Sequence, residues 1–420
     1  MILPGGRTAH SSFNIPIQIN EASNCTFDKE GDKAKMFRRA KLIIWDEAPM
    51  MHRWCFEAFD RTMRDVMSYD GVDNTDKPFG GVTVVLGGDF RQILSVIRKA
   101  GREDILASSI NSSKLWSHCK VLKLMTNMRL SASTDHVEQA DIRKFADWIL
   151  SIGDGIGSAN EVGEICLTIP DELLIKDLPD PLRSLVDFVY PNFLENMKIS
   201  KFFQERGILA PTLDAVEHVN EFLLSLVPGD EKEYISSDSV CQSDANSEIE
   251  SQWFTTKFLN DIKCSGVPNH KLRFKVECPV MLMRNIDQAA RLFNGTRLIV
   301  DKLGKNFIGA TIITGKTAGE KIIIPRMNLV PSDPGLPFKF TRRQFPLTLC
   351  YAMTINKSQG QTLSHVGIYL SKPVFTHGQL YVAVSRVTSM KGLKILISNE
   401  EGCVCTDTTN VVYHDVFRNV

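Results

Sequence analysis

An apolar run that ends in two adjacent carboxylates is the feature that most constrains how this chain folds. Residues 42–49 read Leu-Ile-Ile-Trp-Asp-Glu-Ala-Pro. Charged side chains gain nothing from burial, so a buried strand ending at Asp46 and Glu47 places both carboxylates at the carboxyl edge of a sheet, where open α/β folds bind ligands. Asp46 can hold Mg²⁺ there while Glu47 activates a water molecule. A merely solvated strand end gives the same local pattern, so the neighbouring segments decide.

A second strand-like segment ends in a similar way. Residues 83–86 lead into Gly87-Gly88-Asp89-Phe90-Arg91-Gln92. Glycine lets the backbone come close to a ligand, and the Gln92 amide can donate to a γ-phosphate and accept from an attacking water. Alone, this segment is equally explained by a Gly-rich turn with a surface glutamine. Together, the two strand ends predict a nucleotide site.

Three later segments make the pattern specific. Residues 126–129 read Thr-Asn-Met-Arg, residues 352–362 read Ala-Met-Thr-Ile-Asn-Lys-Ser-Gln-Gly-Gln-Thr, and residues 381–386 read Tyr-Val-Ala-Val-Ser-Arg. The order of these segments and their amino-acid sequences resemble those of the Pif1-like helicases, which are superfamily 1 motors of the 5′ to 3′ type. The resemblance is strongest to the plant and Helitron-associated branch. The resemblance covers nearly the whole chain. It implies an α/β fold of two RecA-like motor domains, the first incomplete, with a small SH3-like β module inserted in the second.

The resemblance also assigns roles to individual residues. Asp46 and Glu47 match motif II, and Gln92 lies in motif III. Arg129 and Arg386 resemble the two arginines that reach the γ-phosphate from the second motor domain. Motif Ia (residues 6–11) and motif V (residues 354–361) touch single-stranded DNA in the family, which implies contacts through Thr8, His10, Ser11, Thr354, Asn356, Lys357, Ser358 and Gln359.

The function implied is an ATP-dependent 5′–3′ DNA helicase that uses Mg²⁺ and ATP. Such a motor moves on single-stranded DNA and acts at duplex junctions, in DNA repair, recombination and telomere maintenance. Phosphoryl transfer needs a metal, an oriented water and positive charge near the transferred group, and the residues named above supply most of these. The resemblance further implies a monomer located in the nucleus, with an organelle as the other possibility.

Two alternatives stay open. The chain can be a truncated, catalytically inactive relative or transposon relic that at most binds single-stranded DNA. A nucleotide-dependent switch without nucleic acid ranks last, because it leaves residues 354–362 without a purpose.

The phosphate-binding loop of the family, G-x-x-x-x-G-K-[ST], should stand before motif Ia, and the sequence begins too late to include it. Gly315-Lys316-Thr317 has the right ending, but Ala310 stands where the upstream glycine is required. The flanking segments read as strands, whereas a phosphate loop must lead into a helix whose amino end faces the anion. We therefore predict a hairpin turn here. From these 420 residues alone we expect weak single-strand binding and no appreciable ATP hydrolysis.

Composition restricts the remaining possibilities. The chain has 49 basic and 49 acidic residues, so any DNA affinity must be local. Charge runs that are candidates for it, although such runs are usually just solvated faces, comprise Lys33, Lys35, Arg38, Arg39, Lys41, Lys339, Arg342 and Arg343. No stretch is long enough to span a bilayer, and the start lacks the features of a secretory signal. The ten cysteines include no CxxC pair, so metal binding through them is not expected.

The motifs divide the chain into four segments. They are a partial first motor domain (1–125), the first part of the second with an exposed insert near 228–252 (126–293), the SH3-like module (294–335), and the remainder of the second motor domain (336–420).

Within the second motor domain, residues 207–212 are predicted to form a strand followed by a helix capped by Thr212. Further strands are expected at 366–370 and 393–397. The chain departs from the family pattern at two places: Leu94-Ser95 replaces two prolines, and Glu277 stands where a glycine usually precedes Cys278-Pro279.

Overall fold

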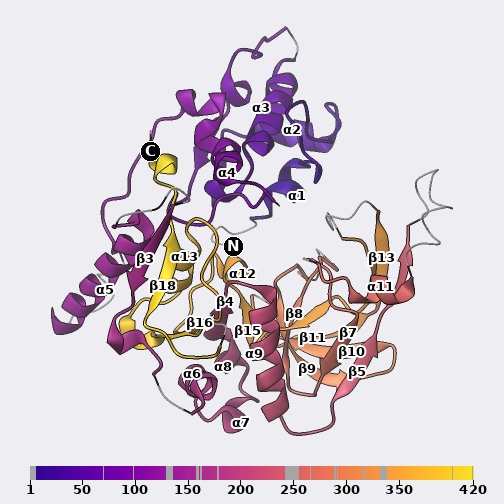
Figure 1. Ribbon diagram of the computed structural model, residues 1–420. Coiled ribbons are helices and arrows are strands. Elements are labelled where there is room, and N and C mark those ends of the chain that lie inside the picture. Colours follow the sequence, from indigo (N-terminus) through magenta and orange to yellow (C-terminus); the bar gives the residue numbers. More distant parts are fainter. Residues whose placement is uncertain are drawn as a thin grey trace.

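The protein is described by a computed structural model of 420 residues. Its described residues are 6–69, 71–97, 99–128, 136–157, 160, 163–176, 179–241, 255–264, 266–287, 290, 292–315, 317–331, 338–399, 401–418 and 420. They form a first unit that holds the amino-terminal helices, a central unit built on a parallel sheet, and a β module beside it (Figure 1). Within these ranges no helix is both long and apolar enough to cross a membrane.

The first unit packs helices against a short parallel sheet. Its elements are α1 (Ala9–Phe13), α2 (Asp32–Arg39), β1 (Leu42–Trp45), α3 (Arg53–Met67), β2 (Thr83–Leu86) and α4 (Arg102–Ser108). Strands β1 and β2 pair in parallel, from Leu42 opposite Thr83 to Trp45 opposite Leu86. An aromatic cluster fills the space between sheet and helices, with the Phe13 and Phe59 rings 4.1 Å apart.

The buried strand expected before Asp46 is buried on one face only. Ile43 and Trp45 are 8% and 4% exposed, whereas Leu42 and Ile44 are 51% and 50% exposed. Successive residues of a strand point to opposite faces, so β1 presents every second side chain to solvent.

The central unit carries a parallel sheet in the order β15-β4-β16-β17. Its strands are β4 (Arg206–Ala210), β15 (Ala352–Thr354), β16 (His365–Leu370) and β17 (Leu393–Ile397), as expected for the last two and for the segment before Thr212. A second, antiparallel pair joins β3 (Glu164–Thr168) to β18 (Asp407–Val411). The helices are α5 (His136–Asp154), α6 (Pro181–Val189), α7 (Phe193–Asn196), α8 (Ser200–Gln204), α9 (Leu213–Leu226), α12 (Ile355–Ser358) and α13 (Gln379–Val384).

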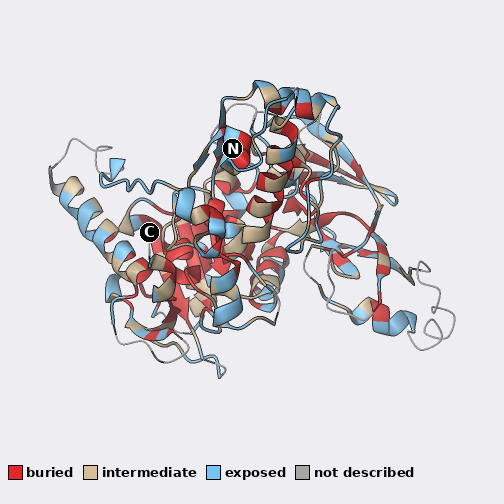
Figure 2. Ribbon diagram, turned by 90° about the horizontal axis from the view of Figure 1, so that it is seen from above, coloured by how far each residue is buried: buried red, intermediate tan, exposed pale blue. Residues whose placement is uncertain are grey.

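Helices cover both faces of this parallel sheet. Residues of α6 and α9 share one apolar cluster with Ile208 of β4. Residues of α5 and α13 share another cluster with Leu209 of the same strand. The strands are therefore mostly buried, and they lie among the red segments in Figure 2. Helix α9 begins as predicted, with the Thr212 hydroxyl oxygen accepting from the Ala215 N–H at 3.3 Å.

The β module consists of antiparallel strands. These are β5 (Lys232–Ile235), β6 (Ser237–Val240), β7 (Lys271–Phe274), β8 (Pro279–Leu282), β9 (Arg297–Leu303), β10 (Phe307–Ile312), β11 (Lys321–Pro325), β12 (Met327–Leu329), β13 (Phe340–Gln344) and β14 (Leu347–Leu349), with the helix α11 (Thr256–Asp261). The main sheet has the order β11-β10-β9-β8-β14. The β structure thus extends well beyond the segment 294–335 that was expected to hold it.

Two expectations for this region have clear outcomes. Part of the predicted exposed insert is ordered, because β5 pairs with β7 and β6 pairs with β13, while residues 242–254 lie outside the described ranges. The hairpin predicted around Gly315 is confirmed, since β10 and β11 pair antiparallel on either side of it and Gly315 has φ +83°. Lys316 lies outside the described residues.

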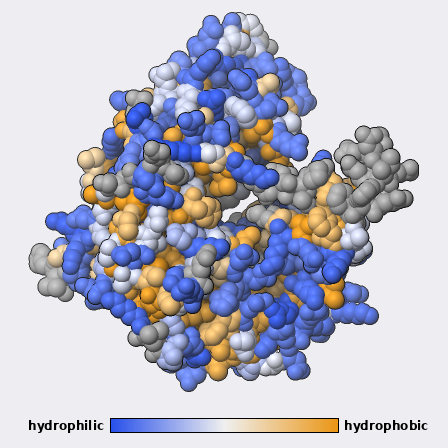
Figure 3. All heavy atoms as spheres, viewed as in Figure 1, coloured by the Kyte–Doolittle hydropathy of each residue, from blue (hydrophilic) through white to orange (hydrophobic). Residues whose placement is uncertain are grey.

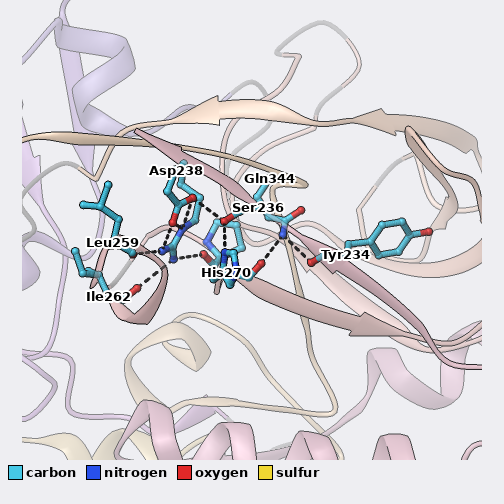
Figure 4. A network of polar contacts seen from close by, with 9 residues as sticks. Tyr234, Ser236, Asp238, Leu259, Ile262, His270 and Gln344 are labelled. Atoms are coloured by element: carbon cyan, nitrogen blue, oxygen red, sulfur yellow. Dashed lines mark hydrogen bonds and ion pairs between the residues drawn. The ribbon is translucent and has the colours of Figure 1, made fainter. Parts of the chain in front are cut away.

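Arg342, a candidate for DNA contact, is instead buried inside the β module. Figure 4 labels three of its partners, Asp238, Leu259 and Ile262. Its guanidinium donates to both carboxylate oxygens of Asp238, at 2.7 to 3.1 Å, and to the backbone oxygens of Leu259, Ile262 and Pro268. Both side chains of the pair are at most 1% exposed. A charge run in the sequence does not reveal that its central arginine has a buried carboxylate partner, and this pair ties α11 to the β6–β13 sheet.

Candidate functional site

The carboxyl ends of β1 and β2 meet at Asp46. The Gly87 N–H donates to Trp45 O and the Ala48 N–H donates to Gly87 O, both at 2.9 Å. A Cβ atom at residue 87 would lie 3.2 Å from Asp46 Oδ1, so glycine leaves room for the carboxylate. That same oxygen accepts from the Glu47 N–H at 3.0 Å, which orients the carboxylate at the sheet edge.

Glu47 follows in a strained, left-handed backbone conformation, with φ +54°. Burial raises the pKa of its carboxyl group, and the negative charge of Asp46 raises it further. Asp89 adds to this effect and Arg386 opposes it. Three carboxylates from two strand ends therefore share one electrostatic environment with an arginine of the central unit.

The loop after β2 is held by side chains of the central unit. The Tyr381 hydroxyl of α13 donates to Asp89 Oδ2 at 2.7 Å. Arg91 Nε donates to Asp154 Oδ1, at the end of α5, at 2.6 Å. These contacts hold the segment that contains Gln92 against the central unit.

A buried histidine adds a third attachment. The Nε2 atom of His377 lies 2.8 Å from Phe90 O, and its Nδ1 accepts from the Tyr413 N–H at 2.9 Å. Two backbone partners of this kind fit a neutral ring with the proton on Nε2. Burial lowers the pKa of His377 to about 4. Next to it, a Cβ at Gly378 (φ +72°) would lie 2.3 Å from Arg91 O, so only glycine allows this approach of the two backbones.

Gln92 itself connects the strand-end site to the motif V segment. Gln359 Nε2 donates to Gln92 Oε1 at 2.8 Å. The remaining oxygen of Gln359, Oε1, is buried and has no hydrogen-bond partner within the part of the chain that is described. The two glutamines expected to serve nucleotide and DNA thus contact each other directly.

The motif V residues form a turn around α12. Thr354 precedes the helix at its N-cap position without a side-chain cap. Asn356 Oδ1 accepts from Gln379 Nε2 of α13 at 3.1 Å, which orients this amide toward the interior. Lys357 is partly buried, and burial lowers the pKa of its ammonium group.

Ser358 and Arg386 occupy positions that the sequence did not predict. Ser358, an expected DNA contact, is fully buried, and its hydroxyl donates to Ile355 O at 2.7 Å, so it stabilises the turn. Arg386 is 7% exposed as a whole residue. Its guanidinium donates to Val382 O at 2.8 Å and to Gln361 O at 3.2 Å. In this conformation Arg386 stabilises the motif V turn through its hydrogen bond to Gln361 O. Its positive charge also opposes the rise in the pKa of Glu47.

The motif Ia residues lie at the start of the first unit. Thr8 and His10 are exposed, with Thr8 at the N-cap position of α1. Ser11 is partly buried, and its backbone oxygen accepts from Lys33 Nζ at 2.9 Å. Arg129, the other predicted arginine, lies outside the described residues.

Sequence reasoning missed the residues that join the two sides of the site. Asp89 and Tyr381 stand inside segments that had been singled out, but neither was given a role. A polar residue within an otherwise apolar segment, such as Tyr381 in Leu-Tyr-Val-Ala-Val, is a signal that could have pointed to a buried partner.

Strand-end carboxylates on one parallel sheet lie near a buried arginine and a polar turn from a second parallel sheet, which is consistent with an α/β fold of two RecA-like domains. Figure 3 shows a hollow between the first unit, at the top, and the β module, at the lower right.

Comparison with known proteins shows which family the chain resembles. The family described as PIF1-like helicase matches residues 1–162, and that described as DNA helicase Pif1, 2B domain, matches residues 257–303. Over these two segments the chain is similar to the Pif1-like helicases. The second match begins upstream of residue 294, in agreement with the larger extent of the β module.

Individual relatives are moderately similar. The ATP-dependent DNA helicase PIF1 of Xenopus laevis is 26% identical over 400 residues, which cover 93% of this chain and 52% of that protein. Pif1 of Bdellovibrio bacteriovorus is 26% identical over 404 residues, which cover 94% of this chain and 75% of that protein. The chain therefore spans about half the length of its vertebrate relatives.

Solved structures share the fold. Bacteroides Pif1 bound to ssDNA matches with a TM-score of 0.60 and 22% identity, over 93% of this chain and 79% of that one. A structure of two coordinating Pif1 helicases at forked dsDNA matches with a TM-score of 0.60 and 24% identity, over 93% and 78%. The expectation of a monomer finds no support in these matches, because the latter structure contains two helicases.

Proposed function

We propose that the protein is an ATP-dependent DNA motor of the Pif1 type, which couples Mg-ATP hydrolysis to 5′–3′ movement on single-stranded DNA. The observation that carries this proposal is the hydrogen bond between Gln92 and Gln359. It joins the loop that follows the acidic strand ends to the turn expected to touch DNA. The family adds the roles in DNA repair, recombination and telomere maintenance, and a nuclear location.

The acidic strand ends fit a magnesium-nucleotide site. Glu47 has a raised pKa because it is buried near Asp46 and Asp89, and a bound divalent cation would relieve that repulsion. Asp46 would hold Mg²⁺, since hard carboxylate oxygens are its preferred protein ligands and only the Glu47 amide donates to this carboxylate among the described residues. When bound, the ion would offset the negative charge of the phosphates.

The protein side chains then divide the chemical work. Glu47 accepts the proton of the attacking water, a task for which a raised pKa is suited. Gln92 orients that water and senses the terminal phosphate through its amide. Any shift of Gln92 toward the phosphate breaks or pulls on its bond to Gln359, so a change at the nucleotide moves the motif V turn.

The catalytic part of the proposal is tested with charge-preserving and charge-removing changes. Glu47→Gln should keep Mg-nucleotide binding and abolish DNA-stimulated phosphate release, while Asp46→Asn should weaken both. The matched control is Asp76→Asn, an exposed carboxylate of the same unit. These variants are compared in a form of the protein that carries a phosphate-binding loop. Equal turnover in wild type and Glu47→Gln would refute Glu47 as the base.

The DNA part of the proposal needs only binding measurements. Lys357→Ala combined with Gln359→Ala should weaken binding to an oligothymidine and reduce the dependence of affinity on salt, because a cation near the phosphates is lost. Unchanged affinity across the salt series rejects the motif V assignment. Strand binding without turnover, even with the loop present, would favour the alternative of an inactive strand-binding relative.

A further inference from the structure

A cavity of about 370 Å³ lies beside the motif V turn, between α9, β7, β14 and β15. Its lining includes a group of apolar side chains that is rich in thioethers, namely Met281, Met283, Leu349 and Met353. Pockets that bind small organic groups begin at about 300 Å³. Nothing in the proposed nucleotide chemistry uses this space.

Two basic side chains in the lining, Lys271 and Lys357, have no carboxylate partner among the described residues, and of these two only Lys357 is partly buried. Lys263 lies 2.6 Å from Glu217 Oε2, and Arg273 pairs with Glu221. For Lys357, by contrast, no carboxylate lies within 4.0 Å among the described residues. Burial lowers the pKa of this ammonium group, so an anion at the rim of the cavity would stabilise its charged form.

The acidic side chains on the α9 wall are already occupied. Glu217 accepts from Lys263 and also from Asn269 Nδ2, at 3.0 Å. Glu221 accepts from Arg273. These pairs reduce the repulsion that a phosphate would otherwise meet on entering, and they connect α9 to the β module across the cavity mouth.

We propose that this cavity receives one unstacked base of the bound single strand, with the phosphate of that nucleotide on Lys357. The inference rests on the proposed function, since it requires a bound strand. Thioethers pack well against aromatic rings, which suits the methionines of the lining to a base. The hydroxyls of Thr348 and Thr354 line the same space, and because a hydroxyl both donates and accepts, they can bond any base edge.

A nucleotide within a strand fits better than a free one. Thr354 and Lys357 belong to both the cavity lining and the motif V turn, so the cavity opens directly onto the expected DNA path. Binding one unstacked base also adds contacts between the motor and the strand. These contacts do not depend on which base is bound.

The experiment uses oligonucleotides that carry 2-aminopurine at successive positions. Its fluorescence rises when the base leaves its stacked neighbours, so the expected result is a rise at one position only. Val216→Trp fills the cavity from a partly buried position on α9 and should abolish the rise. His218→Trp adds the same ring to the same helix at an exposed residue outside this lining and should leave the rise intact.

Affinity measurements with an abasic nucleotide complete the test. Removing the base at the responsive position should weaken binding by wild type about fivefold to a hundredfold, and should cause no further loss in Val216→Trp. Strand binding with no responsive position overturns the cavity assignment but leaves the proposed function standing. Failure of wild type to bind any strand overturns both. Free dAMP that binds wild type but not Val216→Trp, with no position effect in strands, overturns the strand assignment.

Discussion

The two parallel sheets of this protein are built from similar strands but are covered differently. In the central unit, β4 is buried at every residue after Arg206, because helices lie on both faces. In the first unit, β1 alternates between buried and half-exposed residues. Both sheets end in segments that carry the proposed chemistry. Within the described structure, however, only the central sheet has its apolar side chains buried on both faces.

The difference teaches which contacts hold the candidate site together. Leu42, Ile44 and Val85 expose between 48% and 51% of their surface on the first sheet, so each gains only part of the free energy of burial. The loop after β2 relies instead on partners in the central unit, chiefly Tyr381 and His377. The first unit supplies the carboxylates, and the central unit positions the loop that carries Asp89.

The largest expected effect compares the two sheets directly. Ile368→Ala removes a fully buried side chain from β16 and should reduce the free energy of unfolding by about 2–5 kcal/mol. Ile44→Ala acts on a half-exposed residue of β1 and should reduce it by less than about 1 kcal/mol. Thermal unfolding of both variants is the measurement. A loss at Ile44 as large as that at Ile368 would show that the exposed face of β1 is covered in solution.

The next effect concerns pH. His377 has a pKa of about 4 in the folded protein, below the ordinary 6.5, because it is buried, with Asp89 and His414 as its charged neighbours. Between pH 6.5 and 4 the unfolded chain binds a proton that the folded chain does not, so stability falls with falling pH, by roughly 3 kcal/mol for this group. Replacement by asparagine should flatten that part of the pH profile.

The control for the pH prediction is His118→Asn, which changes an exposed histidine of the first unit. It should leave the slope between pH 6.5 and 4 unchanged. An identical slope in His377→Asn and wild type would contradict the role given to the buried ring in holding the Phe90 loop.

A smaller effect is expected from Tyr381→Phe, which removes the hydroxyl that donates to Asp89. Loss of one hydrogen bond to a charged acceptor should destabilise the contact by about 1.5 kcal/mol. Hydrogen exchange in residues 87–92 should rise, while exchange in β16 stays constant. Tyr369→Phe serves as the control, because Tyr369 is partly buried and its hydroxyl has no hydrogen-bond partner among the described residues.

The smallest effect extends the comparison to the β module. Glu277 has φ +72°, a conformation that favours glycine, at the position where the family pattern has that residue. Glu277→Gly should therefore raise the free energy of unfolding by about 1 kcal/mol, measured by thermal unfolding. Glu277→Ala loses the same exposed pairing with Lys198 but keeps the strain. A gain in the alanine variant equal to that in glycine would show that the strain is not the cause.

Much of the site could be predicted from sequence, because strand ends and sequence motifs are each encoded by a few consecutive residues. Asp46 and Gly87 lie side by side because two short apolar runs pair in register. The strand before Asp46 was expected to be buried, but an apolar run does not reveal whether one or both faces are covered. Likewise, Ser358 reads as a polar contact in sequence, and only the turn geometry shows that its hydroxyl faces Ile355 O.

The contacts that were not predicted join residues far apart in the chain. Tyr381 meets Asp89, and Arg342 meets Asp238, across long separations that no periodicity encodes. The ordered strands β5 and β6 escaped prediction for the same reason. Their Ser-, Asp- and Glu-rich sequence has little preference for strands, and they are held by pairing with β7 and β13.

The order of the central sheet also has a consequence for synthesis of the protein. Strand β4 lies in the middle of that sheet, and its two neighbours, β15 and β16, come from residues 352–370. A ribosome that adds about 5–20 residues per second therefore completes β4 roughly 7 to 28 seconds before either neighbour exists. During that interval Ile208, Leu209 and Ala210 have neither neighbouring strand to pair with, so the nascent chain exposes these apolar residues to the chaperones near the tunnel exit.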